Sequence, residues 1–128
     1  MKVGRVRPVR TTGRHEREEE PAGRTPAREP LTEDVVELTA RRLRVIAEPT
    51  RIALLETLNA GEAGVQELAD RIGLSHQIVS HHLKVLWRAG VLDRRRVGTM
   101  TLYAVSDWSA WWVIEQTARW VQSCQDER

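Results

Sequence analysis

The sequence predicts a mainly helical fold with one small β-hairpin, arranged as a winged helix-turn-helix. Residues 65–105 carry this prediction, because they read as a helix, a tight turn, a second helix and a basic two-stranded hairpin. The second helix has one apolar side and one side made of hydrogen-bonding groups. In a winged helix-turn-helix the second helix enters the DNA major groove, so this pattern indicates function as well as fold.

The first helix is predicted over residues 33–47, with Thr32 as its N-cap and acidic residues in its first turn. Its apolar side comprises Val35, Thr39, Leu43 and Ile46. A second helix is predicted to begin at Pro49, whose missing N–H costs nothing in a first turn, and to stop near residues 59–61. Its inward side comprises Ile52, Leu55 and Leu58.

A short third helix is predicted over residues 65–72, with Gly73 as its C-terminal stop. Its buried residues are Leu68 and Ile72. The fourth helix follows at once, capped by Ser75 and ending at Gly90. Helical spacing turns one of its sides toward the core, namely Val79, Leu83 and Leu86.

The other side of the fourth helix carries groups that suit base edges or phosphates: Ser75, His76, Gln77, Ser80, His81 and Lys84. Gln77 can form a bidentate pair with adenine, and His76 can donate to guanine. The two serines suit bases or phosphates, whereas Lys84 and Arg88 are better placed for the phosphate backbone. No acid occurs between residues 70 and 93, which distinguishes this side from an ordinary solvated helix face.

The hairpin is predicted over residues 91–97 and 100–105, with the turn at residues 98–99. Its candidate DNA contacts are Arg94, Arg95, Arg96 and Thr99. Side-chain alternation places the middle arginine on one face and its two neighbours on the other. Such a charged hairpin can hold phosphates or enter the minor groove, and it also prevents edge-to-edge aggregation.

The last helix is predicted from its N-cap Asp107 to about residue 123 and is rich in tryptophan. It carries two adjacent apolar stripes, one with Trp111, Ile114, Ala118 and Val121 and one with Val113, Thr117, Trp120 and Cys124. Two stripes exceed what one small core needs, so we expect one of them to meet a second subunit. A pocket for an apolar effector between subunits is a narrower alternative.

Composition sets the remaining limits. The 128 residues carry a net charge of only +2, but residues 71–96 hold six basic side chains and one acid, as expected of phosphate contacts or of a solvated arginine-rich face. The single cysteine excludes an intramolecular disulfide, and we see no membrane-spanning run or signal sequence. No catalytic motif is recognisable. We therefore expect a cytoplasmic protein that is not an enzyme.

Residues 1–30 differ from residues 31–128, because they hold four of the five prolines and show no periodicity. We expect them to be a disordered, basic and proline-rich arm, either adding DNA affinity or simply solvated. Residues 31–128 are expected to form the domain that binds DNA and dimerises. Within it, His82 lies at the edge of the core and is expected to be structural, since the nearby histidines do not converge on a metal.

Several segments resemble the ArsR/SmtB family of bacterial repressors. They read LRVIAEPTR at residues 43–51, VSHHLKVL at 79–86 and AGVL at 89–92, and the similarity covers residues 32–120. The resemblance implies a homodimer, built from the first and last helices, that binds a palindromic operator and in many members releases it when an effector binds. It implies an interface formed by Val35, Val36, Leu43, Trp111, Ile114, Trp120 and Val121.

The chain departs from the family's metal sensors where they bind metal. The thiolate positions are occupied by residues 64–66, which read GVQ. Of the other ligand set only Asp107 is present. We therefore expect no metal or other cofactor. The resulting prediction is a sequence-specific DNA-binding regulator, a homodimeric repressor, with a protein-interaction module that does not bind DNA as the alternative.

Overall fold

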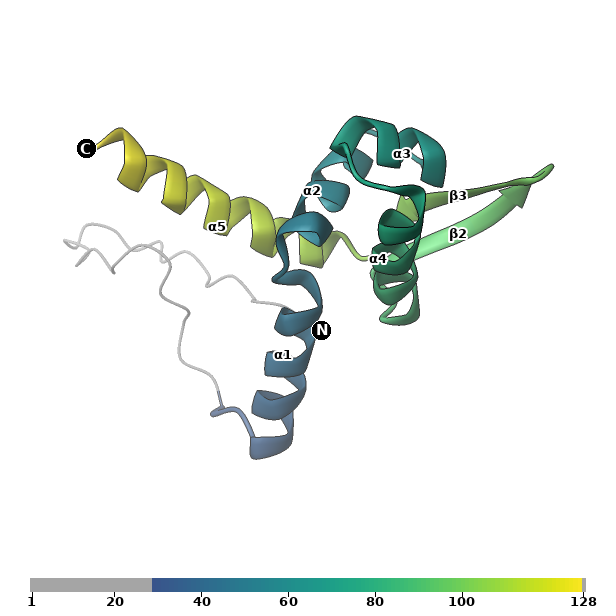
Figure 1. The fold of residues 1–128 in the computed structure, drawn as a ribbon. Coiled ribbons are helices and arrows are strands. Elements are labelled where there is room, and N and C mark those ends of the chain that lie inside the picture. The colour runs from purple at the N-terminus through teal and green to yellow at the C-terminus, as the bar shows by residue number, and fades with distance from the viewer. Residues whose placement is uncertain (1–28, 128) are drawn as a thin grey trace, which may run out of the picture. The chain divides into compact units, whose positions relative to one another are not determined.

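The computed structural model describes residues 29–127, and the order of its elements can be followed in Figure 1. Their bounds are α1 Glu33–Ile46, α2 Pro49–Leu58, β1 Ala63–Gly64, α3 Val65–Ile72, α4 His76–Arg88, β2 Leu92–Val97, β3 Met100–Val105 and α5 Trp108–Asp126. The predicted mainly α fold with a small hairpin is confirmed. The predicted arm, residues 1–30, lies outside the described residues except for its last two, and the chain from Asp34 onward forms one unit.

The hairpin belongs to a three-stranded antiparallel sheet in the order β1-β3-β2. β2 and β3 pair from Leu92↔Val105 to Val97↔Met100, around a turn in which Gly98 takes a positive φ of 63°. The two-residue strand β1, which the sequence does not predict, pairs Gly64 with Leu102. β1 therefore ties the hairpin to the connection between α2 and α3.

The core lies between α2, α3, α4 and the sheet. α4 contributes the three side chains that the periodicity predicts, Val79, Leu83 and Leu86, all fully buried. In α2 the prediction for Ile52 is wrong: its side chain is 38% exposed, and Leu54 is buried instead. The reason is helical phase, because residues 54, 55 and 58 share one side of α2 and residue 52 lies about 200° away from residue 54. Ile72 is only partly buried, against the edge of the core.

The turn between α3 and α4 fixes the start of the fourth helix. Gly73 adopts the left-handed conformation, with φ 82°, and its N–H bonds the carbonyl of Ala69 at 2.8 Å. Ser75 then caps α4, because its hydroxyl accepts from the N–H of Ile78 at 3.2 Å. Among residues 29–127 no helix combines the length and hydrophobicity that a membrane span requires.

Candidate nucleic-acid interface

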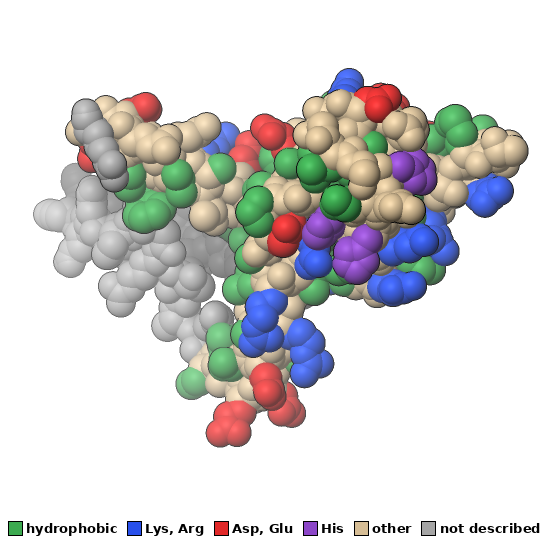
Figure 2. All heavy atoms as spheres, in the orientation of Figure 1, with side chains coloured by type: hydrophobic (Ala, Val, Ile, Leu, Met, Phe, Trp, Pro, Cys, Tyr) green, Lys and Arg blue, Asp and Glu red, His purple; other side chains and the backbone are tan. Residues whose placement is uncertain are grey.

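The polar side of α4 faces solvent, as predicted. Ser80 is half-buried, and the other predicted contacts on this helix and at its N-cap are exposed: Ser75, His76, Gln77, His81, Lys84 and Arg88. Most of them line a shallow hollow of about 350 Å³ on the outer surface of the helix. Figure 2 shows histidine and basic side chains adjoining one another on this face of the molecule. Residues 29–127 therefore leave this surface open to solvent.

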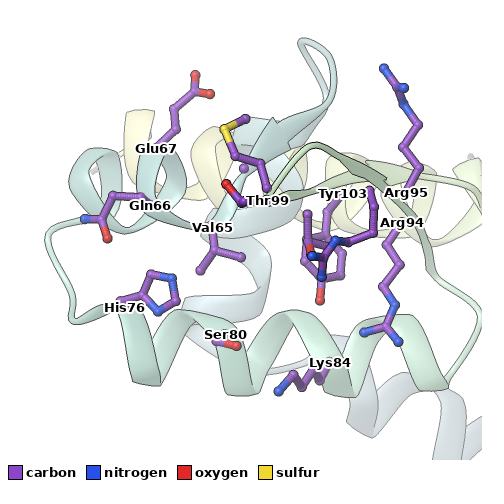
Figure 3. Close-up of a pocket in the computed structure, with 14 residues that line it drawn as sticks. Val65, Gln66, Glu67, His76, Ser80, Lys84, Arg94, Arg95, Thr99 and Tyr103 are labelled. Carbon is purple, nitrogen blue, oxygen red and sulfur yellow. The ribbon is translucent and has the colours of Figure 1, made fainter.

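A larger groove, of about 870 Å³, lies between α4, the start of α3 and the wing, which we define as β2, β3 and their turn. In Figure 3 His76, Ser80 and Lys84 follow one another along α4 beneath the strands. The wing lines the other side with Arg94, Arg95, Arg96 and Thr99, all exposed. Glu67 is the single acidic residue lining it. Val65, Met100 and Tyr103 also line the groove, but its charged side chains are mostly basic, which suits a phosphate backbone.

The three wing arginines have different surroundings. The Arg94 guanidinium lies 3.5 Å from the centre of the Trp87 ring on α4, a cation–π contact. Arg95 donates to both carboxylate oxygens of Glu62, at 3.1 and 2.5 Å. Arg96 has neither a hydrogen-bond nor an ion-pair partner among the described residues. Sequence reasoning placed Arg95 on the opposite face from Arg94 and Arg96, but it missed both Trp87 and Glu62.

His82 has the structural role that its position predicts. Its Nδ1 accepts a hydrogen bond from Arg51 Nε at 3.1 Å, and Glu48 Oε1 lies 3.9 Å from the same atom. Burial, with the nearby charges of Arg51 and His81, lowers the pKa of His82 despite the opposing effect of Glu48. In the described part of the chain no three His, Cys, Asp or Glu side chains gather as a metal site would require.

The geometry agrees with the comparisons to known proteins. A family model described as a helix-turn-helix domain matches residues 46–95. The transcriptional repressor SmtB of Mycobacterium tuberculosis is 35% identical over 78 residues, which are 61% of this chain and only 58% of SmtB. NmtR, a transcriptional regulator of the same organism, is 33% identical over 85 residues, 66% of this chain and 71% of NmtR. The chain belongs to the ArsR/SmtB family.

Solved structures support the same assignment. The crystal structure of the transcriptional repressor BigR from Xylella fastidiosa aligns with a TM-score of 0.60 at 28% identity, over 66% of this chain and 86% of BigR. The matched relatives are named as regulators or repressors and not as enzymes, which favours the non-enzymatic interpretation. The winged helix-turn-helix fold is thereby confirmed for this ArsR/SmtB-family chain.

The residues predicted for the dimer interface of this family member fall into two groups. Five are exposed apolar side chains on α1 and α5: Val35, Val36, Leu43, Trp120 and Val121. The other two pack within the subunit, since Ile114 is only 8% exposed and Trp111 is half-buried against the core. Five of the seven side chains predicted for the interface are therefore exposed among the described residues.

Arg42 is a further residue that sequence reasoning missed. From α1 it donates hydrogen bonds to the Ala89 carbonyl, at the end of α4, and to the Asp107 carboxylate, which caps α5. Burial opposes ionisation of Asp107, but hydrogen bonds from Ser109 and Arg42 hold its pKa below the ordinary value. Arg42 thus links α1 both to the C-terminal end of α4 and to the start of α5.

Proposed function

We propose that this protein is a sequence-specific DNA-binding transcriptional regulator that represses its target as a homodimer on a palindromic operator. The observation that carries the proposal is the exposed, acid-free polar side of α4 beside a basic groove. An ordinary solvated helix would mix acids among its basic residues, whereas a helix that enters the major groove must avoid repelling phosphates. This function also fits a cytoplasmic location.

The proposal divides the surface between base and phosphate contacts. Gln77 and His76, near the N-terminus of α4, are assigned to base edges, because the first turns of a recognition helix reach deepest into the groove. Ser80 and His81 extend the same surface by one turn. Further along the helix, Lys84 and Arg88 are assigned to phosphates. At the wing, Arg96 and Thr99 lie nearest the turn and are assigned to the flanking backbone or minor groove.

The partner that would cover the exposed apolar ends of α1 and α5 is a second copy of the chain. A two-fold axis there would present two α4 helices to half-sites about one helical turn of DNA apart. Replacing Trp120, whose side chain is 66% exposed, with Ala is expected to shift the protein toward monomer in sedimentation equilibrium. Trp112→Ala is the matched control, since Trp112 is 60% exposed, lies outside both predicted apolar stripes and is turned about 80° from Trp120 around α5. Equal dimerisation constants for both variants would contradict this interface.

An effector is a separate prediction, which follows from the family resemblance and from the tryptophans of α5. Three of these side chains are exposed, Trp108, Trp112 and Trp120, so a bound apolar compound would change their fluorescence. The positions that bind metal in the family's sensors lack most of the ligand residues here, so added metal ions should not change this fluorescence. Saturable quenching by zinc would contradict that second expectation.

Binding of labelled DNA, followed by fluorescence anisotropy over a range of salt concentrations, tests the proposed function. The fragment upstream of the protein's own gene is compared with a scrambled duplex of the same length and composition. The specific fragment should bind about 10³-fold or more tightly, and both affinities should fall steeply as salt rises. Equal, weak binding to the two duplexes would instead favour a protein-interaction module.

A further inference from the structure

Two of the three wing arginines are held on opposite faces of the sheet. Arg94 points toward α4, where it meets Trp87, whereas Arg95 points away from α4 (Figure 3). Strand pairing explains why the Arg95 side chain lies close to Glu62. It lies opposite Leu102 on β3, and Leu102 lies opposite Gly64 on β1. Glu62 stands two residues before Gly64 and so shares its face, which lets its carboxylate meet the guanidinium across β3.

We propose that Glu62 and Arg95 form a positioning pair for DNA binding, which sets the angle of the wing and does not itself contact DNA. This inference rests on the proposed function and deepens it. It leaves Arg96, on the same face as Arg94 and closer to the turn, as the arginine of the wing that contacts a phosphate.

The sheet itself gives the wing little support, because β1 contributes only two residues and a two-stranded hairpin is marginally stable. The Glu62–Arg95 pair adds a two-point connection of fixed geometry between β2 and the segment before β1. On the opposite face the Arg94–Trp87 contact connects β2 to α4. The wing is therefore braced from both sides, and its position relative to the recognition helix is set before DNA arrives.

Charge supports the same division of roles. The hydrogen bond from Arg95 holds the pKa of Glu62 below its ordinary value, so the carboxylate is ionised at neutral pH and neutralises the arginine. If Arg95 instead formed an ion pair with a DNA phosphate, the Glu62 carboxylate would lose its partner and lie unpaired beside the DNA. Arg96 can meet a phosphate without breaking any contact among the described residues.

The test uses the full chain and the upstream DNA fragment, with Glu62→Ala, Arg95→Ala, the double variant and the exchange Glu62→Arg with Arg95→Glu. Each single variant should bind about two- to fivefold more weakly, the range expected of an exposed ion pair. The double variant should be no weaker than either single one, and the exchange should recover most of the affinity. The salt dependence of binding should stay unchanged in all four, whereas Arg96→Ala should lower its slope by about one for each lost phosphate contact.

Glu115→Ala and Arg119→Ala provide the matched control, since they remove the same charges from an exposed ion pair on α5. They correct for long-range electrostatic effects on binding. Tighter binding by Glu62→Ala, or a lower salt slope for Arg95→Ala, would overturn the inference, because it would mean that Arg95 contacts phosphate and Glu62 competes with it. Unchanged affinity in Glu62→Ala would overturn it too. Absence of specific binding by the unmodified protein would instead refute the proposed function.

Discussion

Gln77→Ala is the variant that most sharply separates base reading from general attraction to DNA. Gln77 is exposed on the outer surface of α4, and its side chain makes no hydrogen bond to any of residues 29–127, so its loss should leave the fold intact. A bidentate pair with adenine discriminates by about 1–3 kcal/mol, and a homodimer has two such residues. The expected loss on the operator is therefore about 2–6 kcal/mol, or roughly 30-fold to 10⁴-fold in affinity.

The assay compares the operator with scrambled DNA at one fixed salt concentration, because non-specific affinity varies steeply with salt. Gln77→Ala should lose affinity only for the operator. Lys84→Ala, from the same exposed surface, is the control that should weaken binding to both duplexes and lower the salt slope. If Gln77→Ala weakened both duplexes equally, the assignment of this side chain to a base edge would be refuted.

Two further predictions concern stability. Leu83→Ala should lower the free energy of unfolding by about 2–5 kcal/mol in urea titrations, because Leu83 is fully buried. Ile78→Ala, at a position 46% exposed on the same helix, should lower it by about 1 kcal/mol or less. Similar losses in both variants would contradict the assigned orientation of α4. Because folding lowers the pKa of His82, stability should be complete above pH 6.5, the value for the unfolded chain, and should decline as the pH falls through the folded-state value. His82→Gln should weaken that decline in thermal melts between pH 7.5 and 5, and an identical decline in the variant would show that other groups cause it.

Sequence periodicity was sufficient for most of the fold because the signals are local. Each helix cap involves residues only two or three positions apart, and the apolar spacing of α4 repeats every three or four residues. The structure confirms the N-caps of α4 and α5 and the buried side of α4. Ile52 was misplaced because α2 has apolar residues around most of its circumference, so its phase depends on what packs against it.

The sequence predicts which side chains of the candidate site are exposed, but it does not predict the side-chain contacts that hold the wing and the end of α4 in place. Exposure of the polar side of α4 follows from the helical period alone. The contacts that place the wing and the end of α4 join residues far apart in sequence: Arg95 with Glu62, and Arg42 with Ala89 and Asp107. No local pattern marks such pairs. Strand β1 is missed for the same reason, since two residues carry no periodicity and acquire their pairing only from β3.

Amide hydrogen exchange of the protein, measured with and without the operator fragment, tests most directly whether the outer surface of α4 lies against DNA. We expect binding to slow exchange in residues 75–88 and in the wing around residues 94–101, with little change along the exposed side of α5. Unchanged exchange in residues 75–88, with slowing confined to α1 and α5, would contradict the account.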